Sequence, residues 1–273
     1  MLRLATDDGW WLVTHPDHAN LAGEFAAEWG NALFAPPSPR EHVLRAIYAH
    51  DDGWRERDAL TPITREGKPA AFSVELVGTY SAFEEIDLEA YLTVRRNAVQ
   101  LMAAQDPYAA VLISMHTYNL LTERADRSTI RAEQLPLLDA FLEDQLDLQQ
   151  RLQQQVARES PLSLDETDPL RFLENFRLLQ ATDNLSLLAC VDFKGEASLL
   201  HPLRRHAGGA TQVRVRRFAE RSFQLAPYPF VKPHLTFTLR ARFVPGQTFA
   251  SAEQLRTLFN AASVQELAVS VSA

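Results

Sequence analysis

Four polar side chains occupy helix faces that otherwise carry apolar residues. His18, His50, Asp51 and Asp183 each lie three, four or seven positions from leucine, isoleucine, valine or phenylalanine residues. Residues at these spacings share one face of an α-helix, so the four side chains are expected to point toward the core. A buried imidazole or carboxylate without a partner is costly. The pattern therefore requires either hydrogen-bonding partners or a cation that the four side chains share.

A shared cation accounts for all four residues at once. The set offers two imidazoles and two carboxylates, which suits divalent Mn, Fe, Co or Ni and leaves positions open for water. Mg²⁺ and Zn²⁺ are further options. A single histidine on a core face is more often a satisfied structural residue, but a carboxylate is rarely buried without a partner. Taken together, the residues predict a metal site formed by His18, His50, Asp51 and Asp183.

Helices are expected to position these residues. The segment Thr14–Asp17 has the spacing of a capping box and predicts the start of a helix that ends at Gly30. Ser38–Glu41 has the same spacing and predicts a second helix, which stops at Gly53. Four further helical segments are expected at Asp87–Gln105, Pro107–Glu123, Ile130–Ala157 and Asp168–Phe193.

Strand signals lie toward the two ends of the sequence. Leu2–Thr6 and Gly9–Val13 flank a short turn and predict a hairpin. Alternating or β-branched segments follow at Gln212–Arg216, Ser222–Leu225, Leu235–Phe243 and Leu267–Val271, with one amphipathic helix at Ala252–Ala261. We therefore predict a mainly helical, α+β protein with a small antiparallel sheet made from the N-terminal hairpin and the C-terminal strands. Residues 14–195 are expected to form the helical core, and residues 1–13 and 210–273 a β-rich appendage packed on it.

Composition limits the classes of partner. The formal charge of −8 disfavours a protein that binds nucleic-acid backbones, which carries a basic surplus. The apolar runs are shorter than the roughly 20 residues that span a bilayer. A lone cysteine, Cys190, excludes an internal disulfide and fits a reducing cytoplasm, where we expect the protein to be. The irregular stretch 58–81 is long enough to be a functional flap.

Three pieces of sequence resemble the signature of the HD superfamily of metal-dependent phosphohydrolases. In order, they are Asp17–Gly23 around the first histidine, Ala49–Trp54 around the His-Asp doublet, and Ala181–Ser186 around the last aspartate. The likeness covers roughly residues 14–195. The whole chain, with its Gly-Trp pairs and a late Pro-Tyr-Pro-Phe, also resembles an uncharacterised bacterial family of unknown function.

The HD resemblance implies an HD-like helical bundle and a specific chemistry. A metal held by His18, His50, Asp51 and Asp183 would activate a water for hydrolysis of a phosphate ester, and Asp51 would also orient that water. His116 is a further catalytic candidate, facing either the ligands or the phosphate. The candidates for substrate binding are Arg55, Asp58, Arg95 and Arg177. A single ion is expected, because His116 is the only histidine between the doublet and the last aspartate.

Three functions remain as alternatives at this point. The first is a phosphohydrolase acting on a small phosphorylated metabolite or nucleotide. The second is an HD-fold oxygenase with a two-iron centre, and the third is a non-catalytic HD-like ligand-binding or scaffold protein. A homodimer is an open alternative, since strands near both ends of the sequence could offer an edge to a neighbour.

Overall fold

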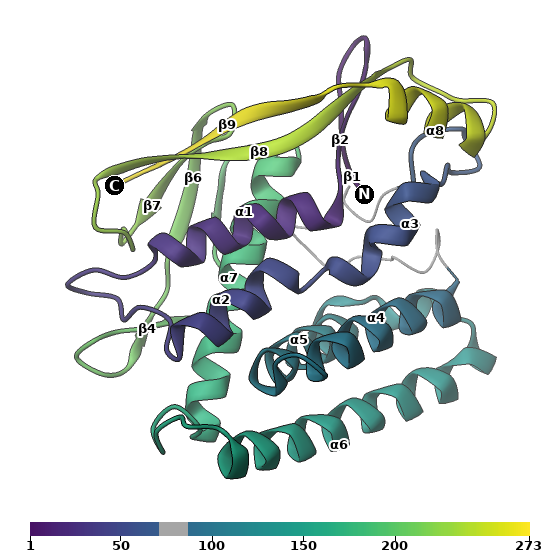
Figure 1. Ribbon diagram of the computed structural model, residues 1–273. Coiled ribbons are helices and arrows are strands. Elements are labelled where there is room, and N and C mark those ends of the chain that lie inside the picture. Colours follow the sequence, from purple (N-terminus) through teal and green to yellow (C-terminus); the bar gives the residue numbers. More distant parts are fainter. Residues whose placement is uncertain (71–86) are drawn as a thin grey trace.

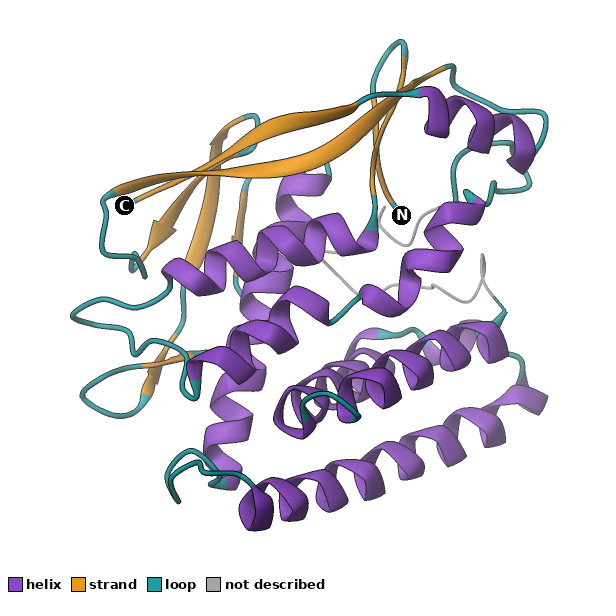
Figure 2. Ribbon diagram, viewed as in Figure 1, coloured by secondary structure: helices purple, strands orange, loops and turns teal. Residues whose placement is uncertain are grey.

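Helices make up about half of the molecule (Figures 1 and 2). The computed structural model describes residues 1–70 and 87–273, so residues 71–81 of the predicted flap lie outside the described residues. The α-helices are α1 (His15–Glu28), α2 (Arg40–Ala49), α3 (Arg55–Leu60), α4 (Leu88–Ala103), α5 (Pro107–Asn119), α6 (Leu135–Glu159), α7 (Pro169–Cys190) and α8 (Ala252–Ala261). Short turns of 3₁₀ or π-helix lie between them: η1 (Asp52–Trp54), η3 (Leu120–Arg124), η4 (Arg127–Thr129) and η5 (Ala132–Gln134).

Side-chain caps explain where several helices begin. The side chains of Thr14, Asp106 and Asp168 accept hydrogen bonds from backbone N–H groups in the first turns of α1, α5 and α7, and a proline stands in each of those turns. The capping box predicted at Ser38 is wrong. No side chain caps α2, and the Ser38 hydroxyl instead donates to Glu166.

The sheet is larger than predicted. Its strands are β1 (Leu2–Ala5), β2 (Gly9–Val13), β3 (Glu196–Ser198), β6 (Arg214–Ala219), β7 (Ser222–Ala226), β8 (His234–Pro245) and β9 (Val264–Ser272). The spatial order is β1-β2-β8-β9-β7-β6-β3. All neighbouring pairs are antiparallel except β7 and β9, which run parallel. The short strands β4 (Leu203–Arg204) and β5 (Ala210–Thr211) pair separately.

The predicted fold class, a helical bundle carrying a small antiparallel sheet, is therefore wrong. The described residues form a curled, mixed, seven-stranded sheet that lies along one side of the helices (Figure 1). Two features of the chain produce the difference. The long strand β8 pairs with β9 over nine positions and with β2 at its far end, which joins the hairpin to the C-terminal strands. The parallel pair also needs a crossover connection, which alternation within a strand does not reveal.

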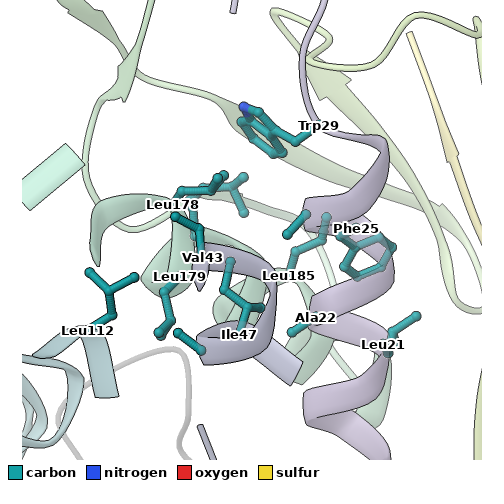
Figure 3. Packing of buried hydrophobic residues seen from close by; sticks show 14 of the residues in the cluster. Leu21, Ala22, Phe25, Trp29, Val43, Ile47, Leu112, Leu178, Leu179 and Leu185 are labelled. Carbon is teal, nitrogen blue, oxygen red and sulfur yellow. The ribbon is translucent and has the colours of Figure 1, made fainter. Parts of the chain in front are cut away.

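The main core lies between the sheet and the first layer of helices. Its buried residues come mainly from α1, α2, α5 and α7 and from the inner face of the sheet, with a few from α4 and α6. Figure 3 shows part of it, with labelled residues of α1 (Ala22 and Phe25), α2 (Val43 and Ile47) and α7 (Leu179 and Leu185). Phe25 also meets Phe237 of β8 with ring centroids 4.7 Å apart. A smaller cluster around Trp54 joins α4 and α6.

None of the described helices is both long enough and apolar enough to cross a membrane.

Candidate metal centre

Helix α1 brings His18 into the interior. Its first turn is fixed by Thr14, whose hydroxyl oxygen accepts from the Asp17 backbone N–H at 3.1 Å. Gly23 lets α1 approach α2 closely, because a Cβ at this position would lie 2.3 Å from the ring of Tyr48. The close packing of α1 on α2 carries His18 to the end of α2, where the His-Asp doublet lies.

The doublet occupies the junction between α2 and the turn η1. His50 keeps a helical backbone as the C-cap of α2, whereas Asp51 departs from it with φ −116° and ψ 14°. This change of direction turns two adjacent side chains into the same interior space. His50 is 0% exposed and Asp51 is 5% exposed.

Helix α7 supplies the last predicted ligand, Asp183, from a segment that is buried on every side. The Asp183 Oδ1 atom lies 3.3 Å from His50 Nε2 and 3.7 Å from His18 Nδ1. The Asp51 Oδ2 atom lies 3.0 Å from His18 Nε2 and 3.9 Å from His50 Nε2. The structure thus brings all four predicted ligands together from α1, the end of α2 and α7.

The hydrogen bonds of His18 identify which ring nitrogen carries the lone pair. The Ser186 hydroxyl donates its single hydrogen to the backbone carbonyl of Asp183 at 2.8 Å. Its oxygen, 3.0 Å from His18 Nδ1, therefore accepts a hydrogen bond from that nitrogen. In the neutral ring Nε2 then bears the lone pair, and it faces Asp51 Oδ2.

His50 has the same arrangement. Its Nδ1 lies 2.7 Å from the backbone carbonyl of Ile47, an acceptor only, so Nδ1 carries the hydrogen. Its Nε2 is buried and makes no hydrogen bond within the described part of the chain, although it faces the carboxylates of Asp183 and Asp51. Two imidazole lone pairs thus face two carboxylates, an arrangement that needs a proton or a cation between them. These residues fit a metal ion.

Charge within the cluster shifts the pKa values of its members. Burial alone lowers the pKa of His50, but the carboxylates of Asp51 and Asp183 raise it to about 9. Burial opposes ionisation of Asp51, yet the cation of Arg95 and the ring of His50 hold its pKa well below the ordinary value. The protein therefore keeps Asp51 ionised and, without a metal, favours a proton on His50.

Arg95 of α4 holds Asp51 through the carboxylate oxygen that does not contact His18. Its Nη1 donates to Asp51 Oδ1 at 2.6 Å. The guanidinium lies over the rings of Trp54 and Tyr91, with 5.1 and 5.3 Å to their centroids. Arg95 therefore bonds to a predicted metal ligand, whereas the HD resemblance predicted that it would contact substrate.

His116 of α5 lies beside the four ligands. Ligand atoms of His50, His116 and Asp183 lie within 4.8 Å of one another, as do those of His18, His50 and Asp51. The His50 and His116 rings meet edge to face with centroids 5.0 Å apart. Burial lowers the pKa of His116 to about 3, so this ring is neutral at ordinary pH. The two groups of potential ligands therefore share His50, and the second group adds His116 and Asp183.

The other predicted substrate contacts lie elsewhere. Arg55 is largely exposed, at 69% of its side chain, and pairs with Asp52. Arg177 is half-buried on α7. Neither forms a hydrogen bond or ion pair with the four ligands in the described structure.

Asp58 belongs to a second buried cluster. Its carboxylate lies 2.5 Å from the N-terminal ammonium of Met1 and 2.9 Å from His15 Nδ1, and it accepts from the His15 backbone N–H at 2.6 Å. The His15 ring stacks on Trp54 with centroids 4.8 Å apart. Asp58, a predicted substrate contact, is therefore tied to the start of α1.

Two residues that support the centre were missed in the sequence. Ser186 orients His18, and Gln180 lies with Nε2 2.6 Å from His116 Nδ1. They stand three positions after and three positions before Asp183, on the same face of α7. Their spacing from Asp183 is the signal that could have found them.

Comparison with protein families finds a match over most of the chain. A family model described as "Protein of unknown function (DUF3891)" matches residues 1–246. The chain belongs to DUF3891. The matched region includes every residue of the candidate centre, so DUF3891 covers the whole site. No curated protein and no solved structure matched the sequence. The likeness to a family of unknown function is thus confirmed, while the relation of this DUF3891 chain to the HD superfamily stays a prediction.

Proposed function

We propose that this protein is a metal-dependent phosphohydrolase that acts on a small phosphorylated metabolite or nucleotide. The observation that carries the proposal is the pair of Nε2 lone pairs, on His18 and His50, that face the carboxylates of Asp51 and Asp183. All four residues are at most 5% exposed, so water competes weakly with a bound ion. The proposal also draws on the resemblance of the three ligand segments to the HD signature.

A divalent transition metal suits these ligands, because imidazole nitrogen and carboxylate oxygen together favour Mn²⁺, Fe²⁺, Co²⁺ or Ni²⁺. Such an ion, when bound, lowers the pKa of a coordinated water and polarises a phosphoryl oxygen.

The residues of the chain have distinct tasks in this proposal. His18 and His50 are held by hydrogen bonds from Nδ1 to Ser186 and to the Ile47 carbonyl, so their Nε2 atoms stay aimed inward. Arg95 occupies Asp51 Oδ1 and leaves Oδ2 for the centre. His116, neutral and buried next to Asp183, is assigned to the substrate oxygen.

An oxygenase with two metal ions is the second candidate. The overlapping groups of potential ligands, one with His18 and Asp51 and the other with His116 and Asp183, are the observation that favours it. The number of ions bound per chain and the consumption of oxygen separate this candidate from the hydrolase.

The experiment measures hydrolysis of a generic phosphate ester with Mn²⁺, Co²⁺ or Ni²⁺. We expect turnover by the unaltered protein and a loss of at least about 100-fold in Asp51→Asn, because the variant loses a charged ligand. Asp52→Asn is the matched control, since Asp52 is the next residue but pairs with Arg55 near the surface. Equal rates in Asp51→Asn and the unaltered protein, or no turnover by folded, metal-loaded protein, would overturn the proposal.

A further inference from the structure

The three histidines of the centre differ in how their Nδ1 atoms are bonded. In His18 and His50, Nδ1 carries the hydrogen and donates it, so each neutral ring holds its lone pair on Nε2, which faces Asp51 in His18 and Asp183 in His50. In His116, Nδ1 lies 2.6 Å from the side-chain amide nitrogen of Gln180. An amide NH₂ group only donates, so this Nδ1 accepts and carries no hydrogen.

The bond from Gln180 removes His116 from the set of metal ligands. A neutral imidazole has one N–H group, so if Nδ1 accepts, Nε2 carries the hydrogen. The lone pair of Nδ1 is occupied by the amide, and Nε2 has no lone pair to offer. Neither nitrogen of His116 can then coordinate an ion, whichever of them lies nearest to His50 and Asp183.

The side chain of Gln180 makes one hydrogen bond in the described structure, the one to His116. Gln180 itself is 0% exposed, and its amide oxygen makes no hydrogen bond to the described residues. This buried amide is therefore bonded to His116 through its nitrogen alone.

We propose that Gln180 is a positioning residue that fixes His116 as a donor from Nε2, so that the centre holds one metal ion and His116 binds an anionic oxygen of the substrate. The inference rests on the proposed function for its last part, since that oxygen belongs to a phosphoryl group. The tautomer and the number of ions do not depend on phosphohydrolase activity. They can therefore be measured in protein that lacks substrate.

The first experiment determines the tautomer of His116 in metal-free protein by ¹⁵N NMR of the imidazole nitrogens. The spectrum of a His116→Gln variant assigns the signals of this ring. We expect hydrogen on Nε2 alone in His116 and on Nδ1 in both His18 and His50, with a second hydrogen on Nε2 of His50 in the absence of metal. Hydrogen on Nδ1 of His116 would overturn the inference, and this test requires no change at Gln180.

The second experiment counts Co²⁺ ions per chain by titration and elemental analysis. We expect one ion in the unaltered protein and two in Gln180→Glu, because a carboxylate accepts a hydrogen from Nδ1 and thereby frees the Nε2 lone pair. Gln145→Glu is the matched control. Gln145 is also a buried glutamine (2% exposed), but it bonds to Ser114, so this variant should keep one ion.

The outcomes separate this inference from the proposed function. Two ions in the unaltered protein would overturn the inference and leave metal-dependent chemistry in place. No binding of Co²⁺ or Mn²⁺ by the unaltered protein would overturn the proposed function, while the NMR result would still decide the tautomer. If Gln180→Glu does not fold although Gln145→Glu does, Gln180→Leu takes its place. We expect the His116 ring of this variant to be a mixture of its two tautomers. A spectrum that still shows hydrogen on Nε2 alone would contradict the inference.

Discussion

Arg95 and Asp51 form an ion pair that is almost fully buried, with Nη1 2.6 Å from Oδ1 and 7% of each side chain exposed. Arg95→Met removes one partner and leaves a carboxylate in a low-dielectric interior. Breaking a buried pair in this way costs about 3–5 kcal/mol of unfolding free energy. Denaturant unfolding of Arg95→Met measures the loss. Arg55→Met, which alters an exposed pair, should change the unfolding free energy by no more than about 0.5 kcal/mol.

The Arg95 variant should also bind metal less tightly. Arg95 orients Asp51 without being a ligand, and removal of such a partner lowers metal affinity by about 10–100-fold. Calorimetric titration with Mn²⁺ measures this effect in folded protein. An unchanged affinity would show that Asp51 needs no support from α4.

Removal of the metal should destabilise the folded protein. An ion that binds only the folded state, at about 100 times its dissociation constant, raises the unfolding free energy by about 2.7 kcal/mol. Urea unfolding curves with Mn²⁺ and with a chelator measure the difference. Asp183→Asn should abolish it, whereas Asp147→Asn, on the exposed side of α6, should retain it. Superimposable curves for the unaltered protein would contradict the prediction.

Acid should weaken the fold through His15. Burial lowers the pKa of this residue from 6.5 to about 4. Between these values the unfolded chain binds a proton that the folded chain excludes. The unfolding free energy is therefore undiminished by His15 above pH 6.5, and it falls as the pH drops toward 4. The loss is on the order of 3 kcal/mol.

Denaturant unfolding between pH 7 and pH 4 tests this dependence. His15→Gln has no titrating ring at this position and should flatten the curve. His234→Gln, which alters an exposed histidine, should leave the slope as it is. A slope that is the same in all three proteins would assign the acid sensitivity to another group.

Gly23 should tolerate no side chain while Tyr48 is present. A Cβ at residue 23 would lie 2.3–2.5 Å from three atoms of the Tyr48 ring, so Gly23→Ala forces α1 and α2 apart. Overpacking of this kind costs about 1–3 kcal/mol, although alanine is the better helix former. Urea unfolding of Gly23→Ala measures the cost. Recovery in the double variant Gly23→Ala/Tyr48→Ala would locate the strain at this contact, and an undiminished loss would place it elsewhere.

The predicted ligands could be found in the sequence because each is a polar residue at a position that the apolar pattern assigns to the interior. His18, His50 and Asp183 interrupt apolar stripes at helical spacing, and a stripe fixes which way a side chain points. The periodicity of α7 and the cap of α1 then supplied the elements. The metal itself stays a prediction.

The contacts that Arg95 and Asp58 make could not be predicted from the sequence. Arg95 was predicted to bind substrate, and only the placement of α4 beside η1 sets it against Asp51. Asp58 lay in an irregular stretch, where spacing gives no direction, and its contact with His15 joins residues 43 positions apart. Such pairs depend on how the helices pack, which the pattern of one helix does not contain.

The prediction of a small antiparallel sheet was wrong for a related reason. Alternation located several strands, and Ala252–Ala261 was located to the residue as α8. Pairing between strands is a property of the whole chain, however. The parallel contact of β7 with β9 and the extension of β8 to Pro245 follow from the path of the chain between the strands.

The pairing of β2 with β8 governs the order in which the centre assembles during synthesis. β2 leads directly into α1, and its register is set by residues 242–245, more than 220 positions later. Contacts of such large sequence separation form slowly, and this one cannot form before β8 has been synthesised. A nascent polypeptide that has not yet emerged as far as β8 therefore holds His18 on a helix that can pack on α2 and α7 but lacks its anchor to the sheet. Metal loading should be a late event that follows closure of the sheet.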